Sequence, residues 1–131
     1  MNIRPFRRKD AEQVHRLLTD HGYALPVIEW NAVGGHWLVA EIGSKIVACV
    51  MFAPGRPFGY IDFLGFSKDL GHAARSRALK MIESEVCRIL AEYGAQHVLV
   101  NVAFGMKTWS KVLKKRGFGL VGPSNIFYRK L

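Results

Sequence analysis

The chain has 131 residues, of which 50% are hydrophobic, and its 19 Lys and Arg against 10 acidic residues give a net charge of +9. This length suits one domain rather than two, the apolar content excludes a disordered chain, and no apolar run reaches the roughly 20 residues that span a bilayer. We therefore expect a single domain over residues 1–131 that has anionic partners and no membrane contact.

Two features of the sequence predict a cytoplasmic protein. Residues 1–5 carry charge but are not followed by the apolar segment of a secretion signal. The two cysteines, Cys49 and Cys87, lie in a strand-like run and a helical run and fit no metal motif. We expect both to be reduced and near the core, although their spacing does not exclude a disulfide.

The first part of the chain predicts a strand, a helix and a less regular stretch. Residues 3–8 have the pattern of a strand, and Asp10 is a helix cap with Gln13 as its capping-box partner. Gly22 ends this helix. Residues 23–35 form the irregular stretch.

Three strands follow. Residues 37–42 and 45–53 are predicted to form a hairpin through Gly43-Ser44, and residues 58–66 form the next strand. The strand at 45–53 is apolar on both faces, which places it centrally in a sheet.

The remaining residues predict two helices and three strands. Apolar residues at helical spacing predict a long helix over residues 73–93. The other expected elements are a strand over 97–102, a helix over 107–116, and a closing hairpin of 118–121 with 126–128. The order predicts an α/β fold in which one mixed sheet carries helices on both faces.

This order resembles the GNAT superfamily of N-acetyltransferases over nearly the whole chain. Residues 3–11 resemble the first strand and helix cap of that family, and residues 111–118 resemble its helix that ends in Gly-Phe. Tyr93-Gly94-Ala95, before the fifth strand, is also similar. The resemblance implies a GNAT-like fold and transfer of an acetyl group from acetyl-CoA to an amine.

The turn between the fourth strand and the long helix holds the cofactor pyrophosphate in that family, with the pattern Arg/Gln-x-x-Gly-x-Gly/Ala. Here Gly71 replaces the Arg or Gln, while Ala74 and Ser76 supply the small residues. Free amides at a helix start attract anions, and small residues permit close approach. The alternative is a plain helix start with solvated arginines. The residues that the resemblance assigns to the phosphates are Gly71, His72, Ala73, Ala74, Arg75, Ser76 and Arg77.

In the family, the fifth strand diverges from the fourth, and the gap receives the pantetheine arm. The resemblance places this arm near Leu64, Gly65, Phe66 and Asn101. Gly65 suggests a bulge or a close backbone approach, or it is an accident of packing. A basic helix face would meet the adenosine phosphate or an acidic partner, unless it is only solvated surface; it consists of Lys107, Lys111, Lys114 and Lys115.

Two residues are candidates for proton transfer. Asp62 lies where the family often carries its base, and it is the only acid in an apolar strand, where burial would raise its pKa. The alternative is an ion-paired or edge-exposed aspartate. The position of the family's acidic tyrosine is Leu113 here, so Ser110, one turn earlier, is the candidate acid, with Tyr60 or Tyr128 as substitutes.

The histidines predict no metal site, because His15, His21, His36, His72 and His97 are not at ligand spacing. His36 would line the acceptor pocket or is an ordinary surface residue.

The sequence as a whole predicts an N-acetyltransferase with acetyl-CoA as co-substrate and a small-molecule or protein amine as acceptor, acidic in view of the +9 charge. A second hypothesis is a GNAT-fold binding module without catalysis. Nucleic acid is not the expected partner, because no recognised motif is present and the basic residues are spread along the chain. The last helix and hairpin could form a homodimer.

Overall fold

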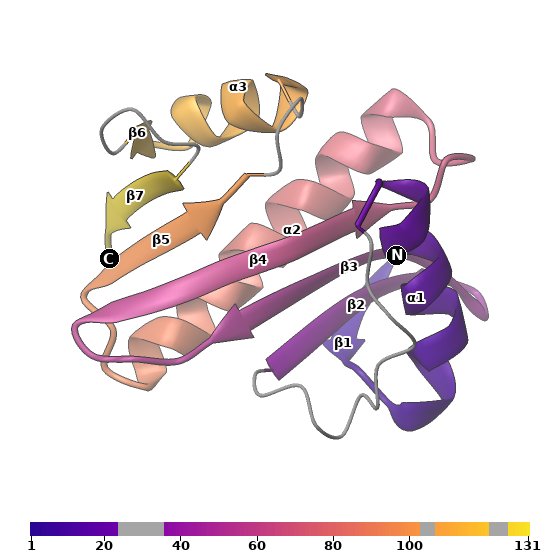
Figure 1. Cartoon of the computed structure of the whole chain (residues 1–131), viewed down its shortest axis with the longest axis horizontal. Helices are drawn as coiled ribbons and strands as arrows, with labels where there is room; N and C mark the ends of the chain where they lie inside the picture. The colour runs from indigo at the N-terminus through magenta and orange to yellow at the C-terminus, as the bar shows by residue number, and fades with distance from the viewer. Residues whose placement is uncertain (24–35, 103–106, 121–125) are drawn as a thin grey trace.

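The computed structural model describes residues 1–23, 36–102, 107–120 and 126–131, although not the side chains of 107, 108, 126 and 128. These residues form a seven-stranded sheet in the order β1-β2-β3-β4-β5-β7-β6 (Figure 1). The strands are β1 (Asn2–Pro5), β2 (His36–Ile42), β3 (Lys45–Ala53), β4 (Phe58–Phe66), β5 (His97–Asn101), β6 (Gly119–Leu120) and β7 (Ile126–Lys130). The α-helices are α1 (Ala11–Asp20), α2 (His72–Glu92) and α3 (Lys107–Lys115).

The sheet is mixed because one connection crosses over. β4 and β5 are parallel and are joined through α2, whereas the other neighbouring strands pair antiparallel. β3 lies inside the sheet, as its two apolar faces predict. No helix of the described residues is long and apolar enough to cross a membrane.

Helices cover both faces of the sheet. α1 packs on one face, where Leu17 and Leu18 meet Trp37 and Val39. α2 and α3 pack on the other, where Ile82 and Leu113 belong to the larger apolar cluster. We call these the α1 face and the α2 face.

Cys49 and Cys87 are free thiols in the two separate clusters. Burial, the main cause for each, raises the pKa of both thiols to about 12, so neither is a reactive thiolate near neutral pH.

Most predicted boundaries are confirmed to within one residue. The strands over 45–53 and 58–66 match β3 and β4. Gly22 and Gly43 have positive φ, as the end of a helix and a tight turn require. The predicted turn at 122–125 lies outside the described residues, but β6 and β7 do pair antiparallel.

Two predictions near the N-terminus are wrong. β1 ends at Pro5 because the chain turns soon after it: the Phe6 N–H still donates to the Trp37 oxygen at 3.0 Å, and Arg8–Asp10 then form a short 3-10 helix. Gln13 is not a capping partner of Asp10; its Oε1 accepts the Ile46 N–H at 2.9 Å, which ties α1 to β3. The Asp10 carboxylate accepts the Arg7 N–H at 2.7 Å and pairs with Arg4.

Candidate active site

β4 is paired with β5 along only half of its length. Residues 58–61 pair with residues 97–100, and beyond that point β5 pairs with β7 alone. The two strands diverge toward their C-terminal ends, as Figure 1 shows. Residues 62–66 of β4 therefore present an edge that no strand of the described residues pairs with on the β5 side. We call this segment the open edge of β4. The predicted divergence is confirmed.

A bulge bends the strand where the open edge begins. Met51 pairs with Asp62 and Cys49 pairs with Gly65, so one residue of β3 lies opposite two of β4. One of these two is Phe63, which has a φ of 49°. Such a bulge re-aims the neighbouring side chains, and bulges are common beside active sites.

Gly65 is not the bulge residue, in contrast to the first of its predicted alternatives. A Cβ at Gly65 would lie 3.3 Å from both the Cys49 Sγ and the Leu18 Cδ2. The glycine therefore allows α1 to pack closely on β4. The predicted bulge at Gly65 is wrong, but the predicted close approach is confirmed, because the backbone carbon of Leu17 would lie 3.6 Å from that Cβ.

Asp62 lies at the point where the two strands separate. Its Oδ1 accepts the Phe63 N–H at 2.7 Å, and the Asn101 Nδ2 lies 3.3 and 3.4 Å from its two carboxylate oxygens. Met51 of β3 lies opposite both Asp62 of β4 and Trp37 of β2. Because residues that lie opposite one another point to the same face of a sheet, the Asp62 side chain lies with Trp37 on the α1 face. The carboxylate is half-buried among polar groups rather than enclosed in apolar core, and it has no ion pair among the described residues.

The start of α2 lies just beyond the open edge. Gly71 is its N-cap, no side chain caps it, and its first turn contains no acidic residue. Gly71, His72 and Ala73 are exposed, and a Cβ at Gly71 would meet no atom within 4 Å. Free N–H groups and the positive end of a 21-residue helix therefore face open space, which is the arrangement that binds phosphate.

The chain is similar to known proteins in its fold but not closely in its sequence. No protein-family model matches the sequence, and no curated protein matches it. Solved structures do match: a GNAT-family acetyltransferase from Staphylococcus aureus Mu50 has a TM-score of 0.79 at 13% identity over 99% of this chain and 98% of its own. The PaiA N-acetyltransferase from Thermoplasma acidophilum, in complex with coenzyme A, has a TM-score of 0.76 at 14% identity over 99% and 98%. The chain has the GNAT fold.

A third GNAT-fold structure was determined with acetyl-CoA. This acetyltransferase from Brucella melitensis has a TM-score of 0.67 at 14% identity, over 99% of this chain and 87% of its own. At such identities the similarity establishes the fold, and the chemistry has to be argued from this chain's own residues.

The Arg75 guanidinium makes one hydrogen bond within the protein, and its Nε has no hydrogen-bond partner among the described residues. Its Nη2 donates to the Ser67 carbonyl oxygen at 3.3 Å, and its guanidinium carbon lies 5.8 Å from the centre of the Phe66 ring. The side chain thus holds the loop between β4 and α2 against the start of the helix. Arg77 is exposed and, with the backbone amides, is the better candidate for phosphate contact.

The proton donor predicted on α3 is not brought to Asp62. Leu113, at the position of the family's tyrosine, is fully buried. Ser110 is half-buried on the same helix, which covers the α2 face, whereas Asp62 lies on the α1 face. Of the predicted basic face, Lys111, Lys114 and Lys115 are exposed, and the side chain of Lys107 lies outside the described residues.

Tyr23 is a polar neighbour of Asp62 that sequence reasoning missed. The end of α1 is closed by hydrogen bonds from the Gly22 N–H to the Thr19 oxygen and from the Tyr23 N–H to the Leu18 oxygen. This turn places the Tyr23 ring 5.3 Å from that of Phe63. Burial first, and then the charge of Asp62, raises the pKa of Tyr23 to about 12, so the phenol stays protonated. The Gly-Tyr pair after the helix was the available signal.

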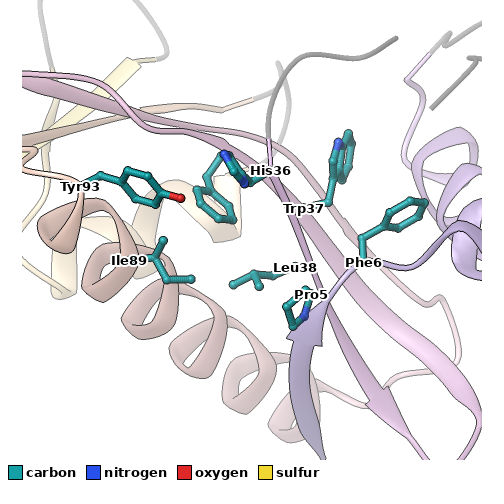
Figure 2. Close-up of a pocket in the computed structure, with 8 residues that line it drawn as sticks. Pro5, Phe6, His36, Trp37, Leu38, Ile89 and Tyr93 are labelled. Carbon is teal, nitrogen blue, oxygen red and sulfur yellow. The ribbon is translucent and has the colours of Figure 1, made fainter. Parts of the chain in front are cut away.

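His36 does line a pocket, and its own side chain lies on the face away from Asp62. Its ring stacks on Phe52 at 5.3 Å and lies 5.9 Å from the Tyr93 ring. Figure 2 shows His36 of β2 facing Ile89 of α2 and Tyr93, which directly follows that helix. Phe52 belongs to the α2-face cluster, whereas Trp37, which also lines this pocket, belongs to the α1-face cluster, so the pocket is lined from both faces of the sheet. Among the described residues, no three His, Cys, Asp or Glu side chains are grouped to hold a metal ion.

Proposed function

We propose that the chain is an N-acetyltransferase that transfers an acetyl group from acetyl-CoA to a primary amine within one ternary complex. The observation that carries the proposal is the continuity of three features along β4 and α2. An anion site at Gly71–His72–Ala73 follows an open strand edge, and that edge begins at Asp62.

The described residues fit coenzyme A in shape and chemistry. The pyrophosphate suits the uncapped N-terminus of α2, where Arg77 adds positive charge. The pantetheine arm carries two amides, which can pair with an open strand edge as an added strand does. With the phosphates at Gly71 and the arm along residues 62–66, the thioester end would lie toward Asp62.

Asp62 is the proposed base. It would take a proton from the attacking amine, directly or through water, as a new N–C bond forms at the acetyl carbonyl and the C–S bond breaks. The thiolate of coenzyme A leaves and receives a proton from solvent or from a nearby group. Asn101 orients the carboxylate, and Tyr23, which stays protonated and is close enough to sense the charge of Asp62, is a candidate donor.

The acceptor has a route to Asp62 over the α1 face. α1 covers this face near β3 and β4 but leaves Phe58 and Tyr60, on the same side of β4 as Asp62, 44% and 42% exposed. We propose an acceptor of acidic character, because the chain carries a net charge of +9, which attracts anionic partners.

Titration calorimetry with coenzyme A tests the phosphate site. Ala73→Glu adds a negative charge in the exposed first turn of α2, where it repels phosphate although it interacts favourably with the helix dipole. We expect the dissociation constant for coenzyme A to rise roughly fivefold or more, because two like unit charges about 4 Å apart repel by about 1 kcal/mol even in water. Ala91→Glu, exposed in the last turn of the same helix, is the matched control and should bind as the wild type does. Equal binding by both variants would remove the phosphate site from the proposal.

A binding module without catalysis is the second candidate, and the buried Leu113 is the observation that favours it. The same titration followed by an amine screen separates the two. Coenzyme A binding with acetyl transfer supports the enzyme, whereas binding with no transfer to any amine supports the module.

A further inference from the structure

The last residue of β4 exposes its backbone toward the open edge. The Ser67 N–H donates to the Val47 oxygen of β3 at 2.8 Å. Because successive residues of a strand point their N–H and C=O groups to opposite sides, both groups of Phe66 face away from β3. They face the side from which β5 has diverged. Phe66 thus offers one donor and one acceptor to whatever lies along this edge.

A histidine from the end of α1 occupies that place. The Nε2 of His21 lies 2.9 Å from the Phe66 N and 2.9 Å from the Phe66 O, and its ring meets the Phe66 ring edge-on at 6.3 Å. The backbone of His21 is fixed by hydrogen bonds from its N–H to the Leu17 and Leu18 oxygens. The side chain therefore reaches the edge from a rigid helix end.

One ring nitrogen cannot satisfy both backbone groups at once. A protonated Nε2 donates to the carbonyl oxygen and leaves the Phe66 N–H without an acceptor, whereas an unprotonated Nε2 accepts the N–H and leaves the oxygen without a donor. A secondary amide of an extended ligand offers a C=O and an N–H side by side, and it can satisfy both groups. An amide-bearing ligand is therefore the better partner for Phe66.

We infer that the His21 side chain holds the open edge of β4 in the free protein and leaves it when the amide arm of coenzyme A pairs with Phe66. This inference rests on the proposed function. His21 is a positioning residue in this scheme: it keeps the edge from pairing with other strands and is exchanged for the ligand. Each binding event breaks one imidazole hydrogen bond, so His21 lowers the affinity for the complete cofactor.

Calorimetry of His21→Ala with two ligands tests the exchange. Removal of the competing hydrogen bond should tighten coenzyme A binding roughly 3- to 10-fold, the net worth of one such bond. Adenosine 3′,5′-bisphosphate has the phosphates but no amide arm, so its affinity should not change. His97→Ala is the control, because His97 stacks on Phe58 at 5.1 Å at the paired end of β4. An unchanged or weaker affinity for coenzyme A, or an equal gain for both ligands, would overturn the inference.

The wild-type protein gives a second measurement that does not depend on the folding of a variant. The nuclear Overhauser contact between the His21 ring and the Phe66 amide should be present in the free protein and lost with saturating coenzyme A. If coenzyme A binds and the contact persists, the exchange is wrong and the proposed function stands. If neither wild type nor variant binds coenzyme A, the proposed function fails and the exchange with it.

Discussion

Two regions of the molecule hold a carboxylate between structural elements, and they treat it differently. At the junction of α2, α3 and β7, Glu83 is 3% exposed and is paired with both Arg116 and Arg129. Where β4 and β5 separate, Asp62 is half-buried and, within the described part of the chain, accepts only from the Phe63 N–H and the Asn101 amide. The first carboxylate is bound by two charged donors, whereas the second meets no charged donor among the described residues.

This difference separates a structural role from a chemical one. A carboxylate between two guanidinium groups has both oxygens occupied by charged donors, so it serves to hold the elements that carry those donors together. The Glu83 cluster also joins three elements, since Arg116 follows α3, Arg129 lies on β7 and the Arg129 Nη1 donates to the Arg116 oxygen at 3.1 Å. Asp62 joins only neighbouring strands, so its loss should cost little stability. The comparison predicts that the two sites respond to substitution in opposite ways.

The largest expected effect is on catalysis at Asp62. Asp62→Asn keeps the size of the side chain and a carbonyl oxygen for the Phe63 N–H, but removes the base. We expect kcat/KM for the amine to fall about 100-fold or more, within the 10²–10⁴ that a general base supplies. The urea midpoint and the affinity for coenzyme A should stay near their wild-type values.

Glu12→Gln is the control for Asp62→Asn, because it removes a carboxylate from an exposed pair on α1 that touches no part of the site. A fall in stability as large as the fall in activity would mean that Asp62 is structural, and the contrast with Glu83 would disappear.

The next largest effect is on stability at Glu83. Glu83→Gln leaves two guanidinium groups without their counter-ion, and breaking a buried pair costs about 3–5 kcal/mol. Because the side chains of Arg116 and Arg129 remain 27% and 25% exposed, water compensates in part, and we expect about 2–3 kcal/mol in urea unfolding. Glu85→Gln on the same helix breaks an exposed pair with Arg88 and should cost less than about 1 kcal/mol. If Glu83→Gln and Glu85→Gln lower the free energy of unfolding by similar amounts, burial does not distinguish the two ion pairs.

The elements of this fold were largely predictable because their signals are local. The apolar run at 45–53 and the turn glycines Gly22 and Gly43 define strand and helix ends without any knowledge of neighbours. The resemblance also placed Asp62 where the two strands separate, because the position of a residue along a strand follows from the element order.

The failures share a cause: each depends on a contact between distant segments. Gln13 bonds to β3 rather than to its own helix start, and Gly65 is small because α1 lies against it. Arg75 donates to the Ser67 oxygen, a contact that its place beside the predicted phosphate site does not indicate. His21 reaches a strand that lies 45 residues further along the chain, and no pattern around His21 indicates this. Sequence spacing locates a side chain on its own element but does not choose its partner.

The smallest expected effect concerns Asn101, and it separates two roles for that residue. The resemblance assigns Asn101 to the cofactor, whereas the structure directs its amide to the Asp62 carboxylate. If Asn101 orients the base, Asn101→Ala should lower kcat/KM for the amine about 3- to 10-fold, the value of one long hydrogen bond, and leave the affinity for coenzyme A unchanged. When Asn101→Ala is added to Asp62→Asn, kcat/KM should fall no further, because no base is left for Asn101 to orient. A weaker affinity for coenzyme A with normal turnover at saturation would return Asn101 to the cofactor site and leave Asp62 held by a single backbone N–H.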